Sequence, residues 1–250
     1  MSDTPRLQDK VAVVTGAGGT MGAAAARALA AQGCRVALVD IRCEPLLPLA
    51  QALGSRALAV ACDIRSADDV QRAYGHIANT LGPVAVLVNN AGVLSNDKIE
   101  ATTPEAWRQV MSVNIDGAMH WAQQVVPGMK AARWGRIVNV GSLAAKTGGL
   151  TAGTAYAVSK GAITALTLSL ARELAPFGVT ANAVAPAYVR TPMVTEALTE
   201  AQRQALLQQI PVGRFCEPEE FAHVVMFLVS PLSGFITGEI VDLNGGLHMD

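Results

Sequence analysis

Short apolar runs recur along the chain, and longer stretches with helical periodicity separate them. The apolar runs cover residues 10–16, 34–40, 56–63, 83–92, 135–142, 178–186 and 238–246. Because consecutive positions in these runs are apolar, both faces of each run are expected to be buried, as in parallel strands covered by helices. The helical stretches between them include residues 20–32, 66–81, 104–131 and 154–175.

The alternation of strand and helix continues through all 250 residues. It predicts an α/β fold with one doubly wound domain over residues 1–250. We expect a mainly parallel sheet of about seven strands with helices on both faces. Residues 187–215 fit the alternation least well, and we expect them to form a loop with a short helix that covers a substrate.

A glycine-rich stretch, TGAGGTMG at residues 15–22, directly follows the first predicted strand and opens the first predicted helix. Backbone N–H groups at a helix N-terminus attract a pyrophosphate when no Cβ stands in the way. Asp40 ends the second predicted strand, where a carboxylate can accept hydrogen bonds from an adenosine ribose. Together these features predict a dinucleotide site. A turn that only needs small residues is the alternative at this point.

Four polar residues in the second half of the chain suggest proton chemistry. Tyr156 and Lys160 lie four apart in the helical YAVSK, so they share a face. An ammonium group near a phenol lowers its pKa and makes it a usable acid or base at neutral pH. Ser142 ends the fifth predicted strand, at the edge where sites form. The amide of Asn114, inside a helical stretch, either bonds the backbone or holds a water for proton transfer.

These motifs agree in order with those of the short-chain dehydrogenase/reductases, which the chain resembles over nearly its full length. The segments that carry the resemblance are TGAGGTMG, NNAG (89–92), the tetrad of Asn114, Ser142, Tyr156 and Lys160, NAVAPAYVRTP (182–192) and ITGEIVDLNGG (236–246). The resemblance implies a Rossmann-like fold. It also implies reversible hydride transfer between a nicotinamide and a secondary alcohol or ketone.

The resemblance also implies a role for each matching residue. Tyr156 would be the general acid/base, Ser142 would orient the substrate oxygen, Lys160 would hold the nicotinamide ribose, and Asn114 would anchor a water relay. Asp63 and Ile64 would border the adenine. The full set of expected cofactor contacts is Gly16, Thr20, Met21, Gly22, Asp40, Ile41, Asp63, Ile64, Asn90, Gly92, Tyr156, Lys160, Pro186, Val189 and Thr191.

Two positions depart from the family pattern. Thr20 stands where the middle glycine of the turn is usual, and Ala187 replaces the glycine after Pro186. The Thr20 hydroxyl could cap the helix, bond a phosphate oxygen or crowd the pyrophosphate. Both changes bear on cofactor affinity and leave the tetrad intact.

We therefore predict an NAD-dependent oxidoreductase that interconverts a secondary alcohol and a ketone on a small molecule, such as a hydroxy acid or a sugar derivative. Asp40 would repel the 2′-phosphate of NADP. Arg42 would attract that phosphate unless it points to solvent or pairs with Glu44. Residues Leu143, Ala144, Leu150, Tyr188 and 193–215 would line the substrate pocket.

Two alternatives stay open. One is an NADPH-dependent 3-oxoacyl-carrier-protein reductase, which the chain resembles in VGRFCEPEEFA (212–222) and FITG (235–238). An acidic carrier protein would need basic residues at the mouth of the site. Lys98 is the only basic residue in 93–103, which weakens this alternative without excluding it. The other is a non-catalytic dinucleotide-binding regulator, which would need no acid/base.

Bulk properties narrow the class of protein further. The net charge of −1 indicates no nucleic-acid partner, and no apolar run reaches the roughly 20 residues of a membrane helix. The cysteines form no C-x-x-C pair and the histidines lack zinc-ligand spacing, so we expect free thiols and no metal. AVSKG (157–161) lacks the strand–turn–helix setting of a hydrolase elbow.

We expect a cytoplasmic homotetramer whose helices 104–131 and 154–175 pair across two-fold axes.

Overall fold

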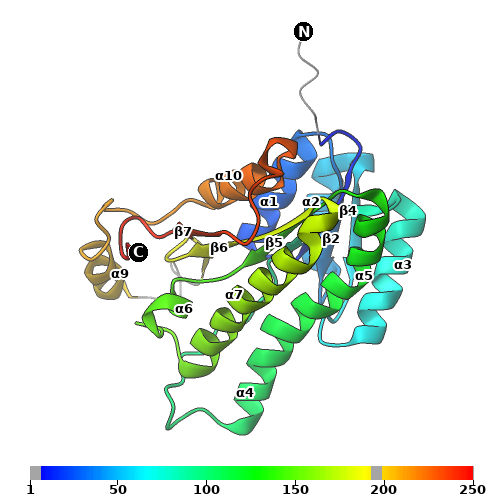
Figure 1. Ribbon diagram of the computed structural model, residues 1–250. Coiled ribbons are helices and arrows are strands. Elements are labelled where there is room, and N and C mark those ends of the chain that lie inside the picture. The colour runs from blue at the N-terminus through cyan, green and yellow to red at the C-terminus, as the bar shows by residue number, and fades with distance from the viewer. Residues whose placement is uncertain (1–6, 193–198, 250) are drawn as a thin grey trace.

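The computed structural model describes residues 7–192 and 199–249, and the strands in these ranges form one parallel sheet (Figure 1). The strands are β1 (Val11–Thr15), β2 (Arg35–Asp40), β3 (Ala57–Ala61), β4 (Val84–Asn89), β5 (Gly135–Val140), β6 (Val179–Pro186) and β7 (Ile240–Leu243). Their order is β3-β2-β1-β4-β5-β6-β7, and each neighbouring pair is parallel. The predicted doubly wound α/β fold is confirmed, and each predicted strand is present.

Helices cover both faces of this sheet (Figure 1). On one face the core contains α1 (Thr20–Ala31), α2 (Leu47–Leu53) and α10 (Pro218–Val229). On the other it contains α3 (Ala67–Leu81), α5 (Gly117–Ala132) and α7 (Thr154–Leu174). Successive residues of β1 alternate between the two cores, since Val13 packs under α3, α5 and α7 while Val14 packs under α1, α2 and α10. This is why the strand is apolar at every position.

The predicted helix at 104–131 is interrupted. Thr103 caps α4 (Pro104–Met111) by accepting a hydrogen bond from the N–H of Ala106 at 3.1 Å. A π-helical turn then spans Ser112–Asp116 before α5 begins. Such turns insert one extra residue into a helix and re-aim the side chains around it, frequently at functional sites. This one contains Asn114.

The segment 187–215 is partly described, because residues 193–198 lie outside the described ranges. The remainder includes α9 (Glu200–Leu207), which begins with a capping box formed by Thr199 and Gln202. A short helix was expected in this segment, and its role in covering a substrate stays a prediction. The short α6 (Ala144–Thr147) follows β5. Within the described ranges, no helix combines the length and apolar content needed to cross a membrane.

A chain of buried amides and hydroxyls runs through the sheet. Asn89 and Asn139 are register partners on β4 and β5, and Nδ2 of Asn89 donates to Oδ1 of Asn139 at 2.9 Å. Nδ2 of Asn139 donates in turn to Oγ1 of Thr167 on α7 at 2.9 Å. All three residues are buried. These contacts fix α7 against the strand that precedes Ser142.

Candidate active site

A cavity of about 1040 Å³ is lined by the segments that follow the carboxyl ends of β1 to β6. It spans the junction of β1 and β4, where the direction of winding reverses, and ligands bind at such junctions in doubly wound sheets. Its wall holds Ser142 and the predicted cofactor contacts, namely Gly16, Thr20, Met21, Gly22, Asp40, Ile41, Asp63, Ile64, Asn90, Gly92, Tyr156, Lys160, Pro186, Val189 and Thr191.

The glycine-rich turn between β1 and α1 uses its glycines in two ways. A Cβ on Gly16, whose φ is +64°, would stand 2.8 Å from the Cα of Ala91. A Cβ on Gly22 would stand 2.7 Å from Nδ2 of Asn90, which donates to the carbonyl oxygen of Gly16 at 3.1 Å. Gly19 has more space, since the nearest atom is 3.5 Å from its Cβ position. Gly16 and Gly22 therefore close the turn, while Gly19 keeps the wall open for a phosphate.

The two departures from the family pattern both lie on the cavity wall. Thr20 is the first residue of α1, but Gly19 holds the N-cap position and no side chain caps the helix. Of the three alternatives for the Thr20 hydroxyl, capping of α1 is therefore wrong, while a bond to a phosphate oxygen and crowding of the pyrophosphate both stay open. The N–H of Ala187 donates to the carbonyl of Leu243 at 3.0 Å.

Asp40 holds a negative charge at the end of β2. Its Oδ2 accepts from the N–H of Gly18 at 3.0 Å, and its Oδ1 accepts from the N–H of Ile41 at 2.8 Å. Arg42 is exposed and is not part of the cavity wall. Among the described residues it makes no ion pair, so the expected alternative of a pair with Glu44 is wrong. The carboxylate therefore faces the cavity without a neutralising arginine from its own loop.

Asp63 and Ile64 follow β3 and line the same half of the cavity. Arg65 binds both carboxylate oxygens of Asp63, and the distance from Nη2 to Oδ2 is 2.6 Å. This ion pair holds the pKa of Asp63 below its usual value. Arg65 also lines the cavity and was missed from the sequence, where its only signal was its position two residues after Asp63.

Ser142 and Tyr156 meet at the other half of the cavity. Ser142 and Tyr156 both line this part of the wall, and Oγ of Ser142 accepts from the N–H of Ala144 at 3.1 Å. Burial raises the pKa of Tyr156 above its ordinary value, and the polar hydroxyl of Ser142 opposes that rise only in part. The expected net lowering of this pKa is therefore wrong, because desolvation of the phenol dominates. Nζ of Lys160 lies 5.6 Å from the centre of the Tyr156 ring.

Lys160 is buried, and among the described residues its ammonium group has a single hydrogen-bond acceptor. Its Nζ donates to the carbonyl oxygen of Val140 at 2.7 Å, and no carboxylate in the described ranges pairs with it. Burial lowers its pKa to about 8. An ammonium group has three donors, so two of them are left for a ligand. Ribose hydroxyls would satisfy them, which fits a nicotinamide nucleoside at this position.

Asn114 does not line the cavity, whereas the other predicted site residues do. Its Oδ1 accepts from the N–H of Val93 at 2.8 Å, and its Nδ2 donates to the carbonyl of Val93 at 3.0 Å and to Oγ of Ser159 at 2.9 Å. The Asn114 amide thus bonds the backbone, which was one of the two alternatives predicted for it. A Cβ on Gly92 would lie 3.3 Å from Oδ1 of Asn114 and 3.4 Å from Nζ of Lys160. Because Gly92 has no Cβ, no side chain stands between the Asn114 amide and the Lys160 ammonium. The water relay through Asn114 stays a prediction.

The substrate end of the cavity contains Leu143, Ala144, Leu150 and Tyr188, as expected. The hydroxyl of Tyr188 lies 3.3 Å from Oγ1 of Thr151, which links the loop before α7 to the segment after β6. Gln202, from the expected segment 193–215, also lines the cavity, and the residues that the sequence did not indicate at this end or its approach are Val93, Leu94, Asn96, Thr147, Thr151 and Ala152. The described part of the chain has no cluster of three histidine, cysteine or acidic side chains that could hold a metal ion.

The fold and the cavity define a dinucleotide-binding oxidoreductase. Residues 16–248 match the family described as Enoyl-(Acyl carrier protein) reductase. The match covers most of the chain and agrees with the motifs of the tetrad. The chain belongs to the short-chain dehydrogenase/reductase family, whose members bind a nicotinamide dinucleotide.

Curated relatives of similar length are named as reductases of 3-oxoacyl-carrier-protein or of acetoacetyl-CoA. The chain is 37% identical over 246 residues to the 3-oxoacyl-acyl-carrier-protein reductase of Aquifex aeolicus, covering 97% of this chain and 98% of the relative. It is 38% identical over 246 residues to the enzyme of the same name from Pseudomonas aeruginosa, covering 97% and 99%. It is 35% identical over 243 residues to the acetoacetyl-CoA reductase of Synechocystis, covering 97% and 98%.

These relatives correct the functional prediction. The expected small-molecule substrate, a hydroxy acid or a sugar derivative, is wrong, because the full-length relatives are named for 3-oxoacyl groups. Lys98 is the one basic residue in 93–103, the segment weighed for contact with an acidic carrier protein. Its Nζ donates to the carbonyl oxygens of Gly149 at 2.8 Å and Ala152 at 2.6 Å. Lys98 therefore braces the loop before α7 and gives no information about the partner.

Proposed function

We propose that this protein reduces the 3-oxo group of an acyl chain held as a thioester on acyl carrier protein. The observation that carries the proposal is that Ser142, Tyr156 and buried Lys160 line one wall of the cavity, with Nζ of Lys160 5.6 Å from the centre of the Tyr156 ring. The names and full coverage of the relatives support the choice of a 3-oxoacyl substrate.

When bound, a reduced nicotinamide supplies the hydride for the carbonyl carbon. Tyr156 keeps its proton at neutral pH, as a phenol ordinarily does, and it is the group placed to protonate the carbonyl oxygen, although burial raises its pKa and makes it a weaker acid. Ser142 hydrogen-bonds the same oxygen and holds it in place. The remaining phenolate is then stabilised by the ammonium of Lys160. The carbonyl gains one hydride and one proton, which gives the 3-hydroxyacyl product.

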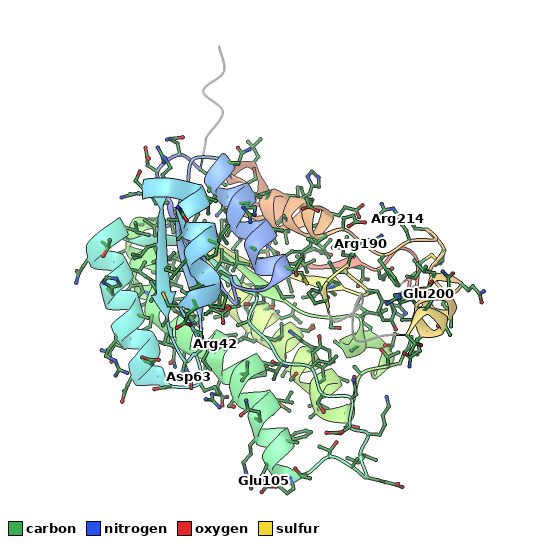
Figure 2. All side chains as sticks on the ribbon, turned by 180° about the vertical axis from the view of Figure 1, so that it is seen from behind. Arg42, Asp63, Glu105, Arg190, Glu200 and Arg214 are labelled. Carbon is green, nitrogen blue, oxygen red and sulfur yellow. The ribbon has the colours of Figure 1, made fainter. Side chains whose placement is uncertain are left out.

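Exposed arginines at the substrate end favour an acidic carrier. Arg190 pairs with Glu217 at 2.8 Å and Arg214 pairs with Glu220 at 2.6 Å, and both arginine side chains are about half exposed. Figure 2 shows Arg190 and Arg214 on the same side of the molecule. Exposed pairs of this kind contribute about 0–1 kcal/mol, so carboxylates of a carrier can replace the glutamates. The KM for a carrier-bound substrate is then expected to rise with salt.

We also propose that NAD is preferred over NADP. Asp40 presents a carboxylate that two backbone N–H groups hold in place, and a 2′-phosphate would meet this charge. Arg42, the basic residue of the same loop, is not part of the cavity wall.

We propose a homotetramer as the assembled state. Val158 and Leu168 on α7 and Met119 on α5 are exposed apolar side chains, at 45%, 50% and 37%. A contact between copies of the chain would bury them. Sedimentation velocity at micromolar concentration tests this, and a stable monomer would contradict it.

The main experiment compares substrates for the purified protein. A 3-oxoacyl-carrier-protein, acetoacetyl-CoA and a panel of simple ketones are each offered with NADH and with NADPH, and loss of the reduced nicotinamide absorbance is followed. We expect turnover of the thioesters and little with simple ketones, and the Tyr156→Phe variant serves as the inactive control. Turnover of simple ketones without turnover of either thioester would refute the proposal.

A further inference from the structure

The cavity has an adenosine half that contains an arginine with no assigned role. This half lies over β2 and β3, the strands on the outer side of β1. In Figure 2, Arg42 and Asp63 mark this side, far from Glu200 of α9 at the substrate side. Since the nucleotide runs outward from the glycine-rich turn, its adenine is expected over these two strands. Arg65 lies on this part of the wall.

The Arg65 guanidinium is held along its edges. Nε lies 2.9 Å from Oδ1 of Asp63 and Nη2 lies 2.6 Å from Oδ2, which is the two-point geometry of an arginine–carboxylate pair. Nη1 donates to Oε1 of Gln109 on α4 at 3.1 Å. Arg65 therefore bridges the end of β3 and α4, with both neighbours on the cavity wall.

The bound edges leave the flat faces of the guanidinium for other contacts. A planar cation of this kind stacks on aromatic rings, and its orientation is already set before a ligand arrives. The side chain is 39% exposed, so a ring placed against it would cover accessible surface. Ile41, Ile64 and Val113 provide apolar wall in the same half.

We propose that Arg65 is a specificity-determining residue that stacks on the adenine ring of the cofactor, with Asp63 and Gln109 as the residues that orient it. In this proposal the role of Asp63 is to hold the Arg65 guanidinium in place. The inference rests on the nicotinamide dinucleotide site of the family and is independent of which substrate is reduced. Failure of one would therefore be distinguishable from failure of the other.

Binding measurements on the full chain test the proposal without turnover. The affinities of NADH, NADPH, ADP-ribose and reduced nicotinamide mononucleotide, which has no adenine, are measured by calorimetry for the parent and for Arg65→Gln. We expect NADH, NADPH and ADP-ribose to bind about 3- to 20-fold more weakly to the variant, from the usual strength of cation–π contacts. We expect the affinity for the mononucleotide to be unchanged.

Two further variants separate stacking from charge and from general damage. Arg65→Lys keeps the charge but loses the plane, so it should bind the three adenine ligands nearly as weakly as Arg65→Gln. Arg108→Gln removes an exposed arginine, paired with Glu105 on the same α4 but outside the cavity wall, and should change none of the affinities. A loss confined to NADPH, or recovered by lysine, would show that Arg65 acts through charge. Equal loss for the mononucleotide would show distortion of the site. Either result overturns the proposal.

Discussion

The two halves of the cavity treat charge in opposite ways. In the adenosine half, Asp63 is ion-paired with Arg65 and Asp40 accepts two backbone hydrogen bonds, so each charge has partners close to solvent. In the catalytic half, Lys160 is buried with one carbonyl partner and the pKa of Tyr156 is raised by burial. Paired, accessible charges suit recognition of a ligand. Buried groups with shifted pKa values suit proton transfer, because a small change nearby alters their protonation.

Removing the phenol should have the largest effect. We expect Tyr156→Phe to lower kcat by about 10²–10⁴-fold, the usual contribution of one general acid. Cofactor affinity should be retained, because the adenosine half is untouched. Stopped-flow turnover and calorimetric binding on the same preparation measure both quantities. A variant with more than half of the parent rate would remove Tyr156 from the mechanism.

The buried ammonium predicts a dependence of stability on pH. The unfolded chain keeps Lys160 charged to pH ~10.4, whereas burial lowers the folded pKa to about 8. Between these values the unfolded chain binds more protons, so the folded state gains stability as pH rises, by up to about 3 kcal/mol. Below pH 8 both states are charged and the cost of burying the charge is constant.

Comparison with Lys160→Met isolates this contribution. The raised pKa values of Cys34 and Cys62 make stability fall at high pH in both proteins, and the difference between them cancels that trend. We expect the methionine variant to be the more stable at pH 7 and to lose this advantage by pH 10. Urea unfolding at both pH values measures it, and a difference that does not depend on pH would rule out a buried charged lysine.

The charge of Asp40 should have a smaller effect, on cofactor choice alone. We expect the parent to prefer NADH over NADPH by at least about tenfold in kcat/KM, equivalent to roughly 1.4 kcal/mol. Asp40→Ala should narrow or reverse the ratio. Asp40→Asn keeps an acceptor for the N–H of Gly18 without the charge, so it should reproduce the change if repulsion is the cause. A parent that uses NADPH as well as NADH would refute this explanation.

The smallest effect is expected at Thr20. Its side chain lines the phosphate region and is far in sequence from the tetrad, so Thr20→Gly should leave kcat within about threefold and alter mainly the Kd of the cofactor. Fluorescence titration with NADH and steady-state kinetics separate the two quantities. If kcat collapsed while the Kd of the cofactor stayed constant, Thr20 would act in the catalytic half of the cavity.

The strands and the phosphate turn could be predicted because their signals are local. A run such as 10–16 is apolar at each position because both faces of β1 are covered, and its glycines follow at once. The same reasoning placed Asp40 and Ser142 at the carboxyl ends of their strands, where the structure has them, whereas Asn90 came only from the family resemblance. Tyr156 and Lys160 share a helix face, which spacing alone determines.

The remaining features depend on contacts between distant segments. The Arg65 side chain is positioned by Gln109, 44 residues away, and nothing in DIRS indicates that contact. The pKa of Tyr156 has the opposite direction to the one expected, because spacing reports the nearby lysine but not the loss of water around the phenol. The π-helical turn at Asn114 was missed since one inserted residue hardly changes a helical pattern.

The Asn89–Asn139 pair has a consequence for how the sheet assembles. In a strand that is apolar on both faces, hydrophobic alternation does not distinguish the native alignment from one displaced along its neighbour. The two amides meet only when β4 and β5 are in the observed register, and a displaced pairing would leave the buried Oδ1 of Asn139 without its donor, at about 1–3 kcal/mol. We therefore expect Asn139→Leu to stay folded but to populate several strand alignments. Duplicated amide resonances for β4 and β5 would reveal such a mixture, and a single sharp set would show that other contacts align these strands.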